Sequence, residues 1–423
     1  MGTPTMGTPT MGTSQRQESI AIVGGGLIGL CAALALQHSG RKVSVIESGS
    51  LLQSEKDPVG LNARSIALSY ASVQIFKALD IWNEVKHLAS PIRTIHISSK
   101  GHWGVSRLKA SDYELEAMGY VIESQLLGNC LLEKINQSKS INLVTRATVE
   151  SIEVEHNSQL SYRSPDGIKS LQTDLIVIAD GAQSKARDSL GIKHETIDYE
   201  QSAIITNVIF DKPIAAAAYE RFTESGPLAM LPLGQNRYAC VWTCKPDDAL
   251  ELMALDDEAF MQSLQQCFGF RLGFIEQVGK RFSFPLQRTE AKSLTQNRCV
   301  LIGNAANALH PVAGQGFNLG LRDIASLQGL LEGRSITNQV ANPGTLSQLL
   351  AAYEQLRQSE QTQVIRLGDG LVSLFSNDLP LLNHFRSAAL GLLDIMPALK
   401  SEVALSGMGL ATGGNAMMRG HLR

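Results

Sequence analysis

Three glycines near the start of the chain have the spacing that a backbone needs to hold a diphosphate. Gly24, Gly26 and Gly29 follow one short apolar run, and Glu47 ends the next one. In this pattern the first glycine permits a tight turn, the second lets a phosphate approach the backbone, and the third lets a helix pack on a strand. A carboxylate at Glu47 can accept the hydroxyls of an adenosine ribose. The spacing therefore predicts a site for the ADP half of a dinucleotide.

A second glycine-rich segment lies far along the chain. Gly303 and Asn304 follow an apolar run, and Gly314, Gln315 and Gly316 open a predicted helix. Backbone N–H groups at a helix start favour negative charge. On a flavin ring that charge develops at the N1/O2 edge during reduction, so a helix aimed there would ease reduction. Taken alone, the segment could equally be a turn that caps a core helix.

A third segment lies between the other two and ends another apolar run. It contains Asp180 and Gly181, followed by Ser184 and Arg187. We expect Asp180 and Gly181 to face the cofactor from a strand end, and Arg187 to pair locally with Asp180. The three segments together predict that the dinucleotide is a flavin.

Composition limits the remaining choices. The 423 residues are 44% hydrophobic, enough for a sizeable core and two or three domains, and a net charge of −3 gives no support for nucleic-acid binding. Six cysteines are scattered, and Cys240 and Cys244 have no second Cys/His pair nearby. We therefore expect reduced, buried thiols, no metal site and a cytoplasmic protein. The sequence contains no run of eighteen apolar residues, so it predicts no membrane-spanning helix.

The elements that must position these segments begin as a strand–turn–helix–strand unit over residues 19–47. Residues 200–245 alternate apolar and polar side chains, which predicts an antiparallel sheet. From residue 315 onward the chain is predicted to be almost wholly helical. The predicted division is a disordered tail at 1–17, a discontinuous cofactor domain at 18–88, 114–190 and 284–338, a substrate domain at 89–113 and 191–283, and a C-terminal helical region at 339–423.

The order of the segments resembles that of the single-component flavoprotein aromatic hydroxylases, most closely the ubiquinone-biosynthesis hydroxylases. Residues 62–68, 221–233 and 303–323 carry the likeness, which runs from about residue 18 to about residue 376. The wider family usually has Gly-Asp where this chain has Gly303-Asn304. An amide can still bind the ribityl chain, and the ubiquinone group has the same residue, so we interpret Asn304 as a mark of that group rather than of a lost flavin site.

The resemblance implies an α/β fold of the para-hydroxybenzoate hydroxylase type. This is an FAD-binding, Rossmann-like domain with an inserted antiparallel-sheet substrate domain and a C-terminal helical cap. It also implies FAD as cofactor, NAD(P)H and O2 as co-substrates, and a prenylated methoxyphenol that attacks a flavin C4a-hydroperoxide. The family has no separate nicotinamide-binding unit, and this sequence has one glycine fingerprint of that type.

The resemblance also assigns roles to residues. The FAD-binding residues would be Gly24, Gly26, Gly29, Glu47, Arg64, Asp180, Gly181, Gly303, Asn304, Gly314, Gln315 and Gly316. Arg64 would reach the diphosphate or ribityl region; the alternative is a surface ion pair. Leu228, Met230, Pro232 and Pro311 would line the substrate pocket, although Leu228 and Met230 could equally be core residues. No acid–base pair or triad is evident, so no catalytic residue is assigned. His310 either touches the flavin or substrate or is satisfied by backbone groups.

The C-terminal tail has an apolar stripe at helical spacing, formed by Leu382, Phe385, Ala389, Leu392 and Met396. It predicts a packed cap, or else peripheral docking to the inner face of a membrane or to partner subunits of a biosynthetic complex. Two alternatives to the leading function stay open. One is a sister hydroxylase with another ring position or substrate, and the other is a non-catalytic flavin-binding scaffold subunit.

Overall fold

The computed structural model describes residues 18–50, 60–101, 105–154, 158–213, 216–308, 315–332, 334, 345–375, 397–410 and 416–421. Several predictions fall outside these ranges: the tail at 1–17, the roles of His310, Pro311 and Gly314, and the apolar stripe at 382–396. In the described residues, no helix is long and apolar enough to cross a bilayer.

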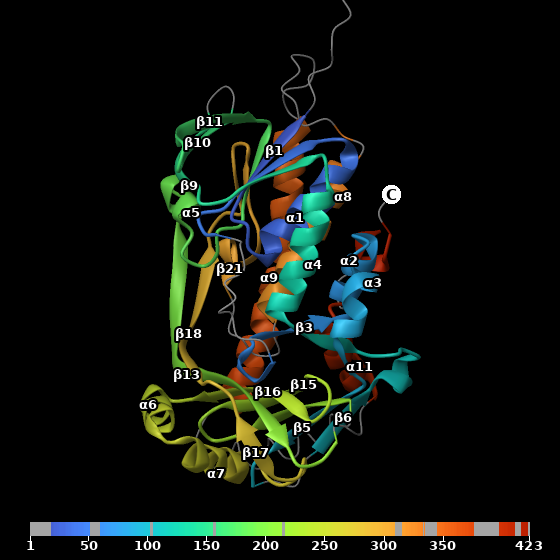
Figure 1. Cartoon of the computed structure of the whole chain (residues 1–423). Coiled ribbons are helices and arrows are strands. Elements are labelled where there is room, and N and C mark those ends of the chain that lie inside the picture. The colour runs from blue at the N-terminus through green and yellow to red at the C-terminus, as the bar shows by residue number, and fades with distance from the viewer. Residues whose placement is uncertain are drawn as a thin grey trace, which may run out of the picture.

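The first glycine segment directly follows β1, which is labelled in Figure 1. β1 belongs to a six-stranded sheet ordered β19-β20-β12-β1-β2-β8. The strands are parallel except for β19. Their bounds are β1 Ser19–Val23, β2 Lys42–Ile46, β8 Ile141–Val144, β12 Leu175–Ile178, β19 Thr295–Gln296 and β20 Cys299–Leu301. The central strands are apolar at nearly every position because they are buried on both faces, as parallel strands usually are.

Helices and two small sheets surround this sheet and share one hydrophobic core with it. The helices are α1 Leu27–Leu36, α2 Tyr70–Ala78, α3 Trp82–Val85, α4 Ser124–Gln137, α5 Lys185–Ser189, α8 Gln315–Leu331 and α9 Thr345–Phe375. One small sheet is β9 Thr148–Glu153, β10 Ser158–Ser164 and β11 Gly167–Thr173. The other is β3 Ser65–Ser69, β4 Ser90–Ile92 and β7 Gly119–Glu123.

A larger, mostly antiparallel sheet lies beyond β3 and is ordered β21-β18-β13-β16-β15-β14-β5-β6, with β17 paired to β13 (Figure 1). Its strands are β5 Thr94–Ser99, β6 Val105–Lys109, β13 His194–Phe210, β14 Ala217–Phe222, β15 Pro227–Pro232, β16 Arg237–Cys244, β17 Ile275–Val278, β18 Phe282–Ala291 and β21 Asn307–Ala308. We call it the substrate sheet.

The two faces of the substrate sheet have different neighbours. Helices α6 Pro246–Ala254 and α7 Asp257–Phe268 cover the outer face. The inner face packs on the cofactor side, where Ala218 and Ala239 cluster with Ile92 of β4 and Val121 of β7. Helix α11, Pro397–Gly407, adds Ala404 to a cluster with Leu108 of β6. The inner face is therefore directed toward the part built on the six-stranded sheet, which is the predicted cofactor domain and which we call the flavin domain.

The architecture confirms the predicted fold class. The strand–turn–helix–strand unit predicted at 19–47 is formed by β1, α1 and β2, and the alternating residues 200–245 lie in the antiparallel strands β13 to β16. One boundary differs from the prediction: β18 pairs with β13 along the substrate sheet, although residues 284–291 were expected in the cofactor domain. β13 and β18 run side by side along one edge of the molecule and join its two parts (Figure 1).

Candidate functional site

The first glycine segment has the conformation that its spacing predicts. Gly24 has φ +101°, and a Cβ there would lie 2.6 Å from the Ala179 carbonyl oxygen. A Cβ at Gly29 would lie 1.9 Å from the Gly24 carbonyl oxygen, so only glycine lets α1 start this close to β1. Gly26 precedes α1, and no atom lies within 4 Å of where its Cβ would be. The turn is thus closed toward the protein and open at the helix start, where an anion binds.

Glu47 lies directly beside this turn. Its Oε2 accepts a hydrogen bond from the Gly25 N–H at 2.6 Å, and its Oε1 accepts one from the Gly49 N–H at 2.6 Å. Each carboxylate oxygen can accept more than one hydrogen bond, so the residue keeps acceptor capacity for a ribose. The two backbone contacts fix the direction of the carboxylate in advance.

The second glycine segment packs against the first, although they are far apart in sequence. Gly303 has φ +59°, and its N–H donates to Asp323 Oδ2 at 2.8 Å. A Cβ at Gly320 of α8 would lie 2.7 Å from Cδ1 of Ile28 in α1 and 3.1 Å from Gly303 Cα. Asn304 is exposed beside the start of α8. The starts of α1 and α8 and the Gly303 turn therefore form one continuous surface.

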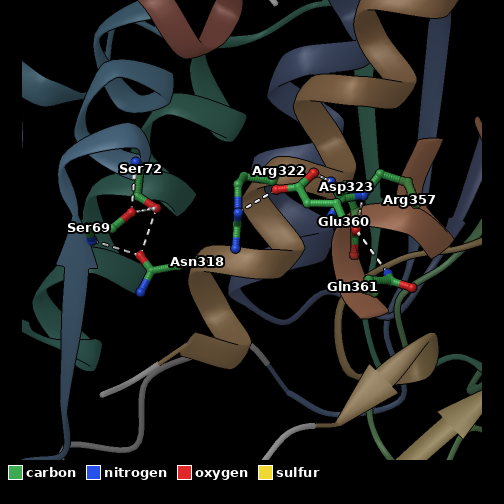
Figure 2. A network of polar contacts seen from close by, with 8 residues as sticks. All are labelled: Ser69, Ser72, Asn318, Arg322, Asp323, Arg357, Glu360 and Gln361. Carbon is green, nitrogen blue, oxygen red and sulfur yellow. Dashed lines mark hydrogen bonds and ion pairs between the residues drawn. The ribbon is translucent and has the colours of Figure 1, made fainter. Parts of the chain in front are cut away.

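Polar side chains hold the start of α8 in place, as Figure 2 shows. Asn318 Oδ1 accepts hydrogen bonds from the Ser69 N–H at 2.8 Å and the Ser72 hydroxyl at 2.7 Å. Asn318 Nδ2 donates to the Ala67 carbonyl oxygen at 2.9 Å. These bonds tie α8 to β3 and to the start of α2.

A buried ionic cluster holds the same helix from the other side (Figure 2). Asp323 Oδ1 accepts from Arg357 Nε of α9 at 2.7 Å, and Glu360 pairs with both Arg322 and Arg357. None of the four side chains is more than 8% exposed. Because Asp323 also holds the Gly303 N–H, the cluster links α9 to the conformation of the Gly303 turn. The sequence prediction missed Arg357 and Glu360, whose i,i+3 spacing on a helix was the one available signal.

A cavity of about 570 Å³ opens beside the start of α1. Its lining consists of Leu27, Asn62, Arg64, Ser124, Gln125, Gly128, Asn129, Leu132, Lys280 and Phe282. The Arg64 guanidinium carbon lies 5.3 Å from the ring centroids of both Phe282 and Phe284. In the described part of the chain Arg64 has no ion-pair partner, so the surface ion pair considered as an alternative is not formed there. Gln125, which the sequence prediction missed, has a buried Oε1 without a hydrogen-bond partner among the same residues.

The predicted pairing of Arg187 with Asp180 is wrong. Asp180 Oδ2 instead accepts from the Ala186 N–H at 3.2 Å. The Arg187 guanidinium is buried, donates to the carbonyl oxygens of Ala182 and Ala305 at 3.2 Å each, and pairs with Asp188. Arg187 therefore fastens the loop after Gly303 to the end of β12.

Asp180 and Gly181 each offer a position that no described residue fills. Asp180 Oδ1 is buried and has no partner among the described residues, and Gly181 has φ +93° with open space around it. An open glycine helix start, an exposed arginine and unpaired amide and carboxylate oxygens are the groups that a dinucleotide would satisfy. The residues present fit FAD.

Of the predicted substrate-pocket residues, the three on β15 lie on the outer face of the substrate sheet, and Pro311 is outside the described residues. Leu228 and Met230 are fully buried in the outer core with Phe260 and Leu264 of α7. Pro232 follows them at the same strand parity and is buried too. The alternative interpretation, that Leu228 and Met230 are core residues, is the one the structure supports. Cys240 and Cys244 are buried in the same outer core, and burial raises the pKa of Cys244 to about 12.

Comparison with known proteins assigns the family. The profile of the FAD binding domain family matches residues 17–367. The chain is 33% identical to a ubiquinone hydroxylase, UbiL, of Rhodospirillum rubrum over 398 residues, which cover 92% of this chain and 89% of the relative. The chain belongs to the FAD-dependent monooxygenase family. A 3-demethoxyubiquinol 3-hydroxylase of Escherichia coli is another relative, with 29% identity over 92% of this chain and 98% of its own.

Solved structures of other proteins share the fold. The p-nitrophenol 4-monooxygenase PnpA of Pseudomonas putida superposes with a TM-score of 0.75, over 94% of this chain and 99% of its own, at 18% identity. At this identity the similarity establishes the fold alone. The cofactor of this monooxygenase family is FAD, and NAD(P)H is the typical co-substrate.

Proposed function

We propose that the chain hydroxylates the aromatic ring of a polyprenylated methoxyphenol intermediate of ubiquinone biosynthesis, using NAD(P)H and O2. The observation that carries this proposal is the extent of the match to the Rhodospirillum rubrum ubiquinone hydroxylase, which includes 92% of the chain. Such a match extends over both the flavin domain and the substrate sheet. It therefore concerns the substrate side as well as the cofactor side.

The residues of the site have distinct tasks in this proposal. Gly24, Gly26 and Gly29 admit the diphosphate to the start of α1, and Glu47 accepts the ribose hydroxyls. Bound FAD supplies the electron transfer and oxygen activation. The start of α8, fixed by Asn318 and by the ionic cluster, presents N–H groups that favour negative charge on the flavin ring.

Further polar groups act around the same cofactor. Arg64 neutralises the diphosphate from the cavity side, and Gln125 and Asp180 satisfy their unpaired oxygens on the cofactor's hydroxyl groups. Asn304, exposed at the start of α8, hydrogen-bonds to the ribityl chain. Gly181, Gly303, Gln315 and Gly316 complete the backbone surface around the ring.

Two related proposals concern specificity and location. The relative named 3-demethoxyubiquinol 3-hydroxylase favours, as a second candidate, a sister hydroxylase acting at another ring position. We also propose peripheral membrane docking through residues 379–423, because an isoprenoid tail partitions into lipid. Liposome flotation with and without these residues tests docking; unchanged flotation would contradict it.

A turnover assay tests the main proposal. The purified protein should be yellow, and a prenylated methoxyphenol should accelerate its oxidation of NADH or NADPH and gain one oxygen atom by mass. The position of the new hydroxyl group separates the leading candidate from the sister hydroxylase. A yellow protein that neither oxidises NAD(P)H nor adds oxygen would instead support the scaffold alternative.

A further inference from the structure

The inner face of the substrate sheet carries one carboxylate in an otherwise apolar row. On β14, Glu220 pairs in register with Ala229 of β15 and with Ile97 of β5. Ala229 pairs in turn with Val241 of β16, which pairs with Ile205 of β13. Paired residues of neighbouring strands share a face, so these five side chains form one row across the sheet.

The neighbours of Glu220 show which face this is. Tyr219 packs on Phe268 of α7, with ring centroids 5.8 Å apart, and so points to the outer face. Successive strand residues alternate, so Glu220 points to the inner face. Ala218, two residues earlier, contacts the cofactor side through Ile92 and Val121. The row of Glu220 is thus the next row along the face that is directed toward the flavin domain.

The preceding row, which contains Ala218, contacts the segment that leads into the cavity beside α1. Asn207 of β13 pairs with Ala239 of β16, and Ala239 pairs with Leu231 of β15. The register of β14 and β15 places Ala218 in this same row. Asn207 Nδ2 donates a hydrogen bond to the carbonyl oxygen of Ala63 at 2.8 Å, and the next residue is Arg64 of the cavity lining. The inner face is therefore in direct contact with the segment that carries Arg64.

Glu220 is in an unusual state for a carboxylate. It is partly buried and forms no hydrogen bond or ion pair with the residues that the structure describes. Burial raises its pKa to about 7, and no neighbouring charge contributes to the shift. The charged groups of α11, the helix that packs on this face, are Lys400 and Glu402. An unpaired carboxylate in an apolar row is costly unless a ligand supplies its partner.

The rest of the row suits an aromatic ligand. Ile97, Val241 and Ile205 are all partly exposed, although they are large apolar residues on a face directed inward. Small-molecule sites are lined mainly by apolar side chains with a few placed polar groups, and this row has that composition. A flat ring could lie on this row with one hydroxyl group at Glu220.

We propose that Glu220 accepts a hydrogen bond from the phenolic hydroxyl of the substrate and takes its proton during hydroxylation. The inference rests on the proposed function and extends it to a named catalytic residue. The phenolic O–H bond breaks and a carboxyl O–H bond forms, which leaves a phenolate whose ring is richer in electrons. The ring gains one oxygen atom from O2 as a hydroxyl group, and Glu220 returns its proton to the phenolate oxygen. The C–H proton that the ring loses passes, with one proton from solvent, into the products of the second oxygen atom and the hydride. NAD(P)H supplies the two electrons, and the second oxygen atom leaves as water.

The test compares Glu220→Gln with Glu224→Gln, the same substitution at an exposed residue four positions on. With a 2-methoxyphenol that carries a short isoprenoid chain, kcat/KM of the wild type should rise with pH through about 7, because the carboxylate is the active form. Glu220→Gln should lose this rise and about a hundredfold in kcat, the lower end of the usual range for a general base. Glu224→Gln should keep both, and Glu220→Asp should recover part of the rate. FAD content and circular dichroism establish that each variant is folded.

A binding measurement separates this inference from the proposed function. The wild type should bind the phenol at least fivefold more tightly than its O-methyl ether, and Glu220→Gln should bind the two alike. Equal discrimination by both proteins would overturn the role of Glu220, as would an unchanged pH profile. If no variant hydroxylates the phenol but the wild type alone discriminates, the proposed reaction fails while the binding role of Glu220 stands.

Discussion

The buried ionic cluster beneath the Gly303 turn makes a quantitative prediction for Arg357→Met. Arg357 is 0% exposed, and its Nε lies 2.7 Å from Asp323 Oδ1 while a second nitrogen contacts Glu360 (Figure 2). Methionine occupies similar space but carries no charge. In the variant Asp323 and Glu360 stay buried, and Arg322 is the one cation left within the cluster.

The expected loss follows from that imbalance. Removing one partner of a buried ion pair costs about 3–5 kcal/mol, because an uncompensated charge is left inside the protein. This is a large share of the roughly 5–15 kcal/mol that stabilises a typical folded domain. The exposed pair of Lys86 and Glu116, at 49% and 59% exposure, gives a matched control. Lys86→Met should cost less than about 1 kcal/mol.

Urea denaturation, followed by circular dichroism, measures the free energy of unfolding of both variants. FAD affinity should also fall in Arg357→Met, because Asp323 holds the N–H of the Gly303 turn. A loss in Arg357→Met no larger than that in Lys86→Met would refute the reasoning. It would mean that water or rearrangement compensates the two carboxylates.

Three further substitutions test the site and the substrate sheet. Gly29→Ala should purify without FAD and so lack visible absorbance, because its Cβ would lie 1.9 Å from the Gly24 carbonyl oxygen. Glu47→Gln should raise the Kd for FAD roughly 10- to 100-fold in a fluorescence titration, since a hydrogen bond to a charged group contributes about 1.5–3 kcal/mol. Burial, and then the charge of Arg271, lowers the pKa of His96 to about 4. Between pH 6.5 and 4 the unfolded chain binds a proton at His96 that the folded protein does not bind, so the free energy of unfolding decreases as the pH is lowered through this interval. His96→Gln should therefore lose less stability than the wild type when the pH is lowered from 6.5 to 4.

Each substitution has a control and a contrary outcome. Gly407→Ala adds a Cβ where no atom lies within 4 Å, so it should keep the yellow colour; a yellow Gly29→Ala protein would contradict the packing argument. Glu276→Gln, at an exposed residue, should leave the FAD Kd unchanged, and an equal effect of Glu47→Gln would exclude a ribose contact. His87 is exposed, and His87→Gln should leave the acid sensitivity intact. Identical behaviour of the two histidine variants would contradict the burial argument.

The sequence was sufficient wherever the determinant is local. The Gly24–Gly29 turn, its strand–helix–strand unit and the helix start at Gln315 could be predicted because glycine spacing and apolar runs decide them within a few residues. Arg187 could not be placed in this way. It lies only seven positions after Asp180, but Ser184 caps α5 by accepting from the Arg187 N–H, and the helix turns the guanidinium toward Ala305. The partner of Arg187 is thus set by a loop more than a hundred residues away.

The faces of the substrate sheet could not be predicted from the sequence either. Along β15 nearly every residue is buried, so alternation cannot tell which parity faces the cofactor. A shift of one residue exchanges Leu228 and Met230 for Ala229 and Leu231 on the inner face. On β14 the same shift exchanges Arg221 for Glu220. Parity is fixed by α7, which covers the face of Met230 and lies later in the chain. The contact between Met230 and α7 places Met230 on the outer face. Because the strands are paired in register, the same contact places Glu220 of β14 on the inner face and Arg221 on the outer face. The polar group of the inner face is therefore a carboxylate and not a guanidinium.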